Sequence, residues 1–242
     1  MADLPPAGQE PGKKSKVEAM FDAIASRYDL LNRVLSLGID QHWRRRVVDR
    51  LRGRPSRRIL DVATGTADLA LQALRIEPEE VVGIDLSEAM LERGRSKVEQ
   101  RGASDRVRLE RADAEDLPFE DGTFDAATVG FGVRNFENLQ AGLTEIARVL
   151  RPGGTLVVLE FSTPRRFPIK QLYGFYLHRV LPHIGGWISP LGGAYRYLPD
   201  SVAVFPDGEV FLRELEEAGF ASPQWTPLLM GIASIYEGRV PE

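Results

Sequence analysis

Stretches of strand length and stretches of helix length alternate along the chain between Arg58 and Phe161. The apolar runs predict strands at 59–61, 81–85, 107–111, 124–130 and 155–161. The amphipathic runs between them predict helices at 67–74, 88–101 and 139–150. Such alternation is typical of a parallel sheet with helices on both faces. A helix over 208–219 and two apolar runs at 224–229 and 232–236 then predict a closing hairpin, which gives a doubly wound, mostly parallel, seven-stranded α/β sheet.

Carboxylates stand at the ends of three consecutive predicted strands. Asp61 ends the first strand and precedes the small-residue turn Thr64-Gly65-Thr66, Asp85 ends the second, and Asp113 follows the third. In a parallel sheet these ends lie together, and ligands bind in the crevice outside them. Asp85 has the position that holds ribose hydroxyls in nucleotide-binding folds. Each acid alone also suits a helix or turn cap, but three at consecutive strand ends favour a site for an adenosine-type ligand.

The turn after the first strand narrows the class of ligand. It has one glycine, Gly65, where the dinucleotide fingerprint needs three, and it lacks the lysine of a phosphate-binding P-loop. Its acidic surroundings suit a ligand with hydroxyls, an amino group and a positive charge. S-adenosylmethionine has all three, so it is the predicted cofactor. We expect Asp113 to accept from the adenine amine, Ala114 to offer its backbone N–H, and Gly130, which has no Cβ, to allow a close backbone approach.

The composition excludes several other kinds of site. The 242 residues include no cysteine and three histidines, which excludes disulfides and thiolate chemistry and argues against a metal site. The net charge of −4 argues against non-specific binding of nucleic acid. The sequence has no signal peptide and no apolar run of about 18 residues. A cytoplasmic protein is therefore expected, with peripheral contact at the inner face of the cell membrane left open.

The regions outside the alternation predict a tail, a cap and an insertion. Residues 1–16 are polar and rich in proline, glycine and lysine, so we expect a disordered tail before a single domain at 17–242. Residues 17–52 have helical periodicity and predict an N-terminal helical cap. Residues 164–207 are rich in aromatic side chains. They predict either a lid over an apolar ligand or a helical hairpin that packs on the core.

The helical cap contains a basic cluster next to Trp43. Arg44, Arg45 and Arg46 are consecutive. We interpret them either as a solvated helix face or as a contact for anionic lipid headgroups. Together with the aromatic insertion, this part of the cap predicts an apolar entrance near a bilayer.

The motifs resemble those of a known class of enzymes. The class I S-adenosylmethionine-dependent methyltransferases have successive motifs similar to LDVATGTADLAL, VVGIDLSEAML, ADAEDLPFEDGTFD and EIARVLRPGGTLVVLEF. The quinone-biosynthesis C-methyltransferases have further segments that resemble FDAIASRYDLLNRVLSLGIDQHWRR, GFGVRNFENL and AYRYLPDSVAVFP. This resemblance extends from Val17 to Tyr236. The chain departs from the wider class in its single-glycine turn, which shifts weight to the Thr66 hydroxyl and to the backbone.

The resemblance implies C-methylation of a reduced, polyprenylated quinone. It favours conversion of demethylmenaquinol to menaquinol over methylation of a benzoquinol in ubiquinone biosynthesis. Two alternatives remain: a methyltransferase for another small apolar acceptor, and a non-catalytic scaffold subunit with the same fold. A homodimer is also left open.

The resemblance also assigns residues to the cofactor. It implies contacts at Thr66, Asp85, Asp113 and Ala114, with Asp61 near the methionine portion. Asp85 is expected to hold the ribose diol by charge-assisted hydrogen bonds.

Methyl transfer to a ring carbon needs an electron-rich ring, so a group that stabilises the phenolate is expected. Arg134 in GFGVRN is the first candidate, because a guanidinium stays protonated. Its alternative role is a salt bridge with a loop carboxylate such as Glu137. His183 or Tyr195, or water relayed by one of them, is the candidate base, although each also suits a purely structural role.

Overall fold

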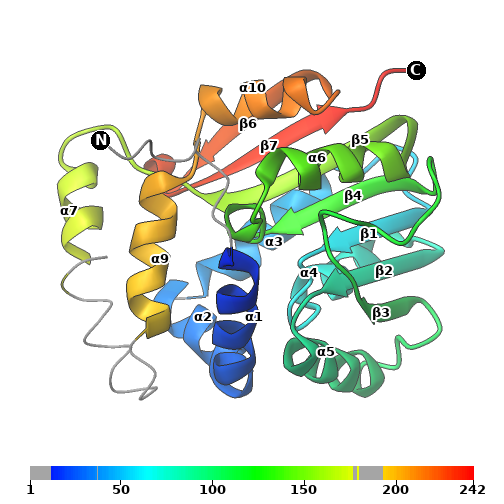
Figure 1. The fold of residues 1–242 in the computed structure, drawn as a ribbon, viewed down its shortest axis with the longest axis horizontal. Helices are drawn as coiled ribbons and strands as arrows, with labels where there is room; N and C mark the ends of the chain where they lie inside the picture. The colour runs from blue at the N-terminus through cyan, green and yellow to red at the C-terminus, as the bar shows by residue number, and fades with distance from the viewer. Residues whose placement is uncertain (1–11, 37, 177–178, 180–192) are drawn as a thin grey trace.

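A seven-stranded sheet forms the centre of the molecule (Figure 1). The computed structural model describes residues 12–36, 38–176, 179 and 193–242. The strand order is β3-β2-β1-β4-β5-β7-β6, with β3 to β5 parallel and β7 antiparallel to both β5 and β6. The bounds are β1 Arg58–Val62, β2 Glu80–Asp85, β3 Val107–Arg111, β4 Phe124–Gly130, β5 Leu150–Phe161, β6 Ala221–Leu228 and β7 Ala233–Arg239. The predicted doubly wound sheet with a closing hairpin is therefore confirmed.

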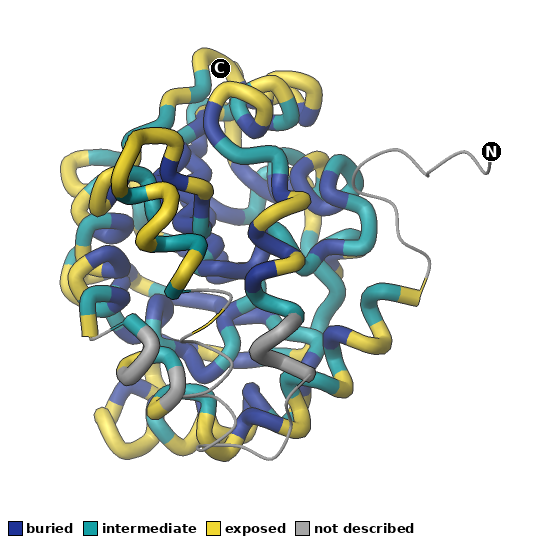
Figure 2. Tube along the Cα trace, turned by 90° about the vertical axis from the view of Figure 1, so that its left-hand side faces the viewer, coloured by how far each residue is buried: buried dark blue, intermediate teal, exposed yellow. Residues whose placement is uncertain are grey.

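The central strands are apolar along their length because both of their faces are covered. Ile59 and Leu60 are adjacent in β1 and completely buried, yet they belong to cores on opposite faces of the sheet. Side chains that alternate between two buried faces read as a continuous apolar run in a parallel sheet. Figure 2 shows the same arrangement as a buried interior surrounded by partly exposed helices.

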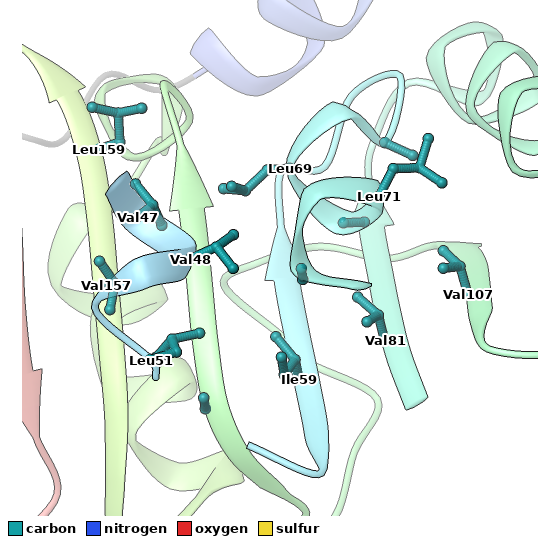
Figure 3. Close-up of a cluster of buried hydrophobic side chains, with 14 of the residues drawn as sticks. Val47, Val48, Leu51, Ile59, Leu69, Leu71, Val81, Val107, Val157 and Leu159 are labelled. Carbon is teal, nitrogen blue, oxygen red and sulfur yellow. The ribbon is translucent and has the colours of Figure 1, made fainter. Parts of the chain in front are cut away.

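The helices divide between the two faces. On one face, α3 (Ile39–Asp49), α4 (Asp68–Ala73) and α5 (Glu88–Gln100) cover the sheet, and on the other face α6 (Leu139–Val149) and α10 (Glu209–Glu217) do so. Figure 3 shows the first core, in which Val47 and Val48 of α3 pack in one cluster with Val157 and Leu159 of β5. Leu51, just after α3, belongs to the same cluster. Each fully buried aliphatic side chain of this kind contributes about 1.5–3 kcal/mol. Helix α3 is thus anchored to the sheet, and this fixes the direction of its polar side chains.

The N-terminal helices lie beyond the carboxyl ends of the central strands (Figure 1). They are α1 (Lys13–Ile24), the short 3-10 helix η1 (Ala25–Arg27) and α2 (Tyr28–Ser36). Helix α1 begins at Lys13, inside the segment predicted to be a tail. The Glu137 carboxylate accepts hydrogen bonds from the backbone N–H groups of Gly12 and Lys14 and so caps this helix. That partner lies more than 120 residues away, so local sequence gives no sign of it.

Part of the aromatic-rich insertion is described. It contains α7 (Ile169–Phe175) and α9 (Gly193–Val204), while residues 177–178 and 180–192 lie outside the described residues. Phe167, Leu172 and Phe175 of the first part are exposed. Whether the insertion is a lid or a packed hairpin stays a prediction. Among the described residues, no helix is long and apolar enough to cross a membrane.

Candidate active site

A cavity lies at the carboxyl ends of the parallel strands, where the sheet topology predicts a ligand site. It encloses about 730 Å³, including the part open to solvent. Helix α1, the start of α2 and the turns after β1, β2, β3 and β4 all contribute to its wall. The wall residues used below are Lys14, Tyr28, Ala63, Gly65, Asp85, Asp113, Ala114, Gly130, Phe131 and Gly132.

The turn after β1 is backbone-strained where it meets the cavity. Ala63 and Ala67 have left-handed φ values of 53° and 63°, and Gly65 between them has 57°. A non-glycine residue in this region costs on the order of 1–3 kcal/mol and is often found at functional sites. The strained turn aims the Gly65 N–H at the Asp85 carboxylate, 2.8 Å away.

Asp85 connects the turn after β1 with the start of α5. Its Oδ2 accepts from Gly65 N and its Oδ1 accepts from Ser87 N at 3.0 Å. Burial raises the pKa of the Asp85 carboxyl, against these two backbone donors, which lower it. The carboxylate is thus oriented at the cavity wall, and its contact with a ribose diol stays a prediction.

Asp113 and Ala114 also line the cavity, at the end of β3. Asp113 Oδ1 accepts from the N–H of Glu115 at 3.0 Å. Its other oxygen forms an ion pair with the Lys14 ammonium of α1. A helical residue outside the sheet therefore occupies the carboxylate that the sequence assigns to the adenine amine.

Asp61 and Thr66 lie close to the turn, but their side chains bond inward. Asp61 accepts from Thr64 Oγ1 at 2.6 Å and from Thr128 Oγ1 at 2.7 Å, and burial raises its pKa to about 6. Thr66 Oγ1 donates to Asp29 of α2 at 2.6 Å and accepts from Lys97 of α5 at 3.0 Å. Neither residue is part of the cavity wall. Their predicted contact with a cofactor stays a prediction.

Polar contacts fasten the N-terminal helices over the cavity. Besides the pair at Asp113 and the bond from Thr66, Ser87 Oγ donates to Asp22 and Arg111 pairs with Glu18 at 2.7 Å. The segment from α1 to α2 therefore forms one side of the cavity, and two of these contacts end on predicted cofactor residues, Asp113 and Thr66.

The turn after β4 brings two glycines to the cavity wall. A Cβ on Gly132 would lie 2.5 Å from the Ala63 side chain, so glycine allows the turns after β1 and β4 to touch. A Cβ on Gly130 would lie 3.1 Å from Nη1 of Arg44 and 3.1 Å from Leu69. Between the glycines, Phe131 has a left-handed φ of 63°. This turn thus packs close to the first turn through Gly132, and the close approach of a ligand at Gly130 stays a prediction.

Arg134 is buried in an ion pair, but its partner differs from the one proposed above. Its Nη1 lies 2.6 Å from Oε1 of Glu160, which is completely buried in β5, and the same nitrogen donates to the Phe131 carbonyl. Glu137 is used instead as the cap of α1. Burial raises the pKa of Glu160, and the guanidinium opposes this rise. Glu160 was missed by sequence analysis, although a carboxylate inside an apolar strand run is a visible signal.

Arg44 corrects the interpretation of the basic cluster. Whereas Arg45 is exposed, Arg44 is 5 % exposed and its guanidinium carbon lies 5.4 Å from the Phe131 ring centroid. Trp43 is also buried and packs against Phe131 and Phe161. Because α3 turns this side inward, Trp43 and Arg44 belong neither to a solvated face nor to a bilayer contact.

The side chains of the two candidate bases, His183 and Tyr195, are not among those that the structure describes. His183 is outside the described residues, and Tyr195 falls in α9 but its side chain is not described. Their assignment stays a prediction. Tyr197 of α9, whose side chain is described, donates to Asn135 Oδ1 at 2.9 Å and so connects α9 with the loop that carries Arg134.

Comparison with known proteins identifies the family. A model of the ubiE/COQ5 methyltransferase family matches residues 10–239. The chain belongs to this family. It is 47 % identical over 227 residues to the demethylmenaquinone methyltransferase of Bacteroides fragilis, which covers 93 % of each chain. It is 48 % identical over 229 residues to the ubiquinone/menaquinone biosynthesis C-methyltransferase UbiE of Geotalea daltonii, covering 94 % of this chain and 97 % of that one.

A solved structure shares the fold of this methyltransferase. A protein of Thermotoga maritima described as an S-adenosylmethionine-dependent methyltransferase has a TM-score of 0.65 at 18 % identity, covering 92 % of this chain and 98 % of that one. Similarity at this identity shows the fold alone. The predicted fold and the predicted family of S-adenosylmethionine-dependent methyltransferases are thus confirmed.

The residues at the cavity fit S-adenosylmethionine. Asp85 and Asp113 supply acceptors at the ends of neighbouring strands, and Gly65 and Gly130 present backbone without a side chain at the cavity wall.

Proposed function

We propose that this methyltransferase transfers a methyl group from S-adenosylmethionine to a ring carbon of a reduced, polyprenylated quinone, with demethylmenaquinol as the substrate. The observation that carries the proposal is the match to the ubiE/COQ5 family over residues 10–239, together with an acid-lined cavity at the carboxyl ends of the strands. The relatives named as demethylmenaquinone methyltransferases favour the menaquinone precursor over the benzoquinol.

The cavity wall supplies groups that suit each part of the methyl donor. Asp85 is proposed to hold the ribose diol, and Asp113 with the Ala114 N–H to hold the adenine. The backbone at Gly65 and Gly130 is proposed to face the methionine portion. When bound, S-adenosylmethionine supplies an electrophilic methyl group on a sulfonium that departs as a neutral thioether. The protein therefore has to orient two reactants and raise the electron density of the acceptor ring.

Arg134 is proposed to stabilise the phenolate of the acceptor. Glu160 fixes the guanidinium at 2.6 Å, and its distance of 5.5 Å from the Phe161 ring centroid places the cation beside an apolar, aromatic wall. A fixed cation in surroundings that exclude water stabilises developing negative charge more strongly than one in solution. His183 or Tyr195, or water relayed by one of them, remains the proposed base for the hydroquinone proton.

The decisive experiment is methyl transfer with purified protein and two reduced acceptors. We expect methylation of reduced demethylmenaquinone at least about tenfold faster than methylation of the demethylated benzoquinol, the size of effect that pocket contacts produce. A preference for the benzoquinol would contradict the menaquinone assignment. Binding of S-adenosylmethionine without methylation of either quinol would support a scaffold or another small apolar acceptor.

We further propose a peripheral contact with the membrane through α7. Phe167, Leu172 and Phe175 are 82 %, 62 % and 63 % exposed, and the exposed Arg166 and Lys170 lie beside them in sequence. Apolar side chains flanked by basic ones suit the interface of an anionic bilayer. Flotation with vesicles containing anionic lipid tests this, and loss of flotation in the Phe167→Ser/Phe175→Ser variant is expected. Flotation equal to that of vesicle-free protein would contradict it. A homodimer stays a prediction that sedimentation velocity tests.

A further inference from the structure

Arg44 is a buried cation whose hydrogen bonding is incomplete. It is 95 % buried, and its Nε has no hydrogen-bond partner among the described residues. Asp40 is the nearest carboxylate, with Oδ2 3.7 Å from Nε, and its oxygens already accept from Ser36 and Gln41. A buried guanidinium with an unpaired N–H group is costly and rare, and it needs a partner.

The guanidinium lies directly behind the wall of the cavity, next to two residues that line it. Its Nη1 is 3.1 Å from the position that a Cβ on Gly130 would have, and its carbon lies 5.4 Å from the Phe131 ring centroid. Both residues line the cavity. Its charge also lowers the pKa of Asp61 and of Tyr28, a third wall residue, in each case against the larger effect of burial. The positive charge of Arg44 thus acts at the ends of β1 and β4.

We propose that Arg44 binds the carboxylate of the methionine portion of S-adenosylmethionine, so that donor binding completes the hydrogen bonding of the guanidinium. This inference rests on the proposed function only in that the cavity holds the methyl donor, and it needs no particular acceptor. A guanidinium suits this role because its forked N–H groups match a carboxylate.

The order of the strands favours the donor carboxylate over the acceptor phenolate as the anion. Adenine is assigned to Asp113 after β3, and the ribose to Asp85 after β2. In the order β3-β2-β1-β4 the next strand ends are those of β1 and β4, so the methionine portion extends toward Gly130 and Arg44. Arg134 is a second cation, already paired with Glu160, and it is the one proposed for the phenolate.

The test compares two donors in a binding measurement without any acceptor. Titration calorimetry is performed with S-adenosylmethionine and with its decarboxylated analogue, which keeps the sulfonium and the amino group. Wild-type protein is expected to bind S-adenosylmethionine about 10- to 100-fold more tightly than the analogue, the range for a hydrogen-bonded charge pair. Arg44→Gln should reduce this preference to about threefold or less. Arg45→Gln, which changes the exposed neighbour, should keep it.

The possible outcomes separate this proposal from the assigned activity. If Arg44→Gln keeps the wild-type preference and instead lowers kcat at saturating donor, the guanidinium serves the acceptor and the proposal is wrong. Equal affinity of wild-type protein for both donors also overturns it, without affecting the proposed function. Absence of any donor binding overturns both. If the glutamine variant does not fold, Arg44→Lys replaces it, and a preference between that of wild type and unity is expected, whereas an unchanged preference contradicts the proposal.

Discussion

Two buried arginines lie over the rings of one stacked aromatic pair, and they differ in what surrounds them. Phe131 and Phe161 stack with their ring centroids 4.4 Å apart, with Arg44 over the first ring and Arg134 over the second. Nη1 of Arg134 has a buried carboxylate at 2.6 Å and a backbone carbonyl. The carboxylate nearest to Arg44 is that of Asp40, at 3.7 Å. In the described part of the chain, Nε has no hydrogen-bond partner in either arginine.

The difference separates a charge that folding pairs with a carboxylate within hydrogen-bond distance from one that folding leaves without such a partner. Removing a charge from water costs several kcal/mol unless partners replace the lost hydration. Folding supplies those partners to Arg134 through Glu160, so that pair is part of the folded framework. Folding alone does not supply them to Arg44, so the unliganded protein bears a cost there that an anion can relieve. Substitution of Arg134 should therefore lower the free energy of unfolding, whereas substitution of Arg44 should weaken donor binding with little loss of stability.

The largest effect is expected for Arg134→Gln. The substitution leaves Glu160 buried without a counter-charge, and breaking a buried pair in this way costs about 3–5 kcal/mol. Urea unfolding at pH 7, followed by circular dichroism, measures the free energy of unfolding. Adding Glu160→Gln removes the stranded charge and should restore more than half of the loss. A loss below about 1 kcal/mol in the single variant would show that the pair contributes little to folding.

The next effect concerns pH, because Asp61 is a buried carboxylate that senses Arg44. Burial raises its pKa from 3.8 to about 6, and the charge of Arg44 opposes this rise. The folded protein thus holds the Asp61 proton more tightly than the unfolded chain does. The contribution of protonated Asp61 to the free energy of unfolding is complete below pH 4 and is lost as pH rises through about 6. The decrease is up to about 3 kcal/mol, at 1.36 kcal/mol per pKa unit.

The difference in unfolding free energy between wild type and Asp61→Asn isolates this decrease from other carboxylates. Measured from pH 4 to pH 8, the difference should change in the stated direction and level off above pH 7. In an Arg44→Gln background the decrease should extend to higher pH, because the opposing charge is gone. A difference that does not vary with pH would mean that Asp61 is ionised throughout, stabilised by Thr64 and Thr128.

Much of the architecture follows from local sequence, because strand and helix periodicity is a local property. The sheet, the closing hairpin and the cavity positions of Asp85, Asp113, Ala114 and Gly130 were all predicted from strand ends and turns. Carboxyl ends of parallel strands converge in any doubly wound sheet, so residues there meet without further information.

What sequence analysis missed depends on contacts between distant segments. Arg44 was grouped with two neighbouring arginines, although Val47 and Val48, three and four residues later, are completely buried on the same side of α3. That spacing was a usable signal. The start of α1 is different, since its cap at Glu137 comes from another part of the chain and no local pattern reveals it. The partner of Arg134 was wrong for the same reason, because Glu160 is 26 residues away in the neighbouring strand.

A smaller effect of opposite sign is expected for Arg44→Gln in the unliganded protein. The substitution removes a buried charge whose Nε has no hydrogen-bond partner in the described residues, and Asp40 keeps its bonds from Ser36 and Gln41. The free energy of unfolding should stay within about 1 kcal/mol of the wild-type value or rise above it. The same urea series as for Arg134→Gln provides the direct comparison. A loss of about 3 kcal/mol or more would mean that Arg44, like Arg134, is completed by folding.

The smallest effect is expected at a third cation, Lys14, which is paired but partly exposed. Its ammonium pairs with Asp113 and Glu115, with side chains between 14 % and 31 % exposed. Pairs of this kind contribute about 0.2–1 kcal/mol and weaken with salt. Lys14→Met should therefore leave global unfolding almost unchanged while hydrogen exchange of α1 amides becomes faster, and Lys16→Met, an exposed neighbour, should change neither.

Because Asp113 is also the proposed adenine acceptor, donor binding should speed α1 exchange in wild-type protein if the adenine amine displaces Lys14, and protect α1 if both bind. The direction of the change shows whether the N-terminal helices open for the donor or close over it.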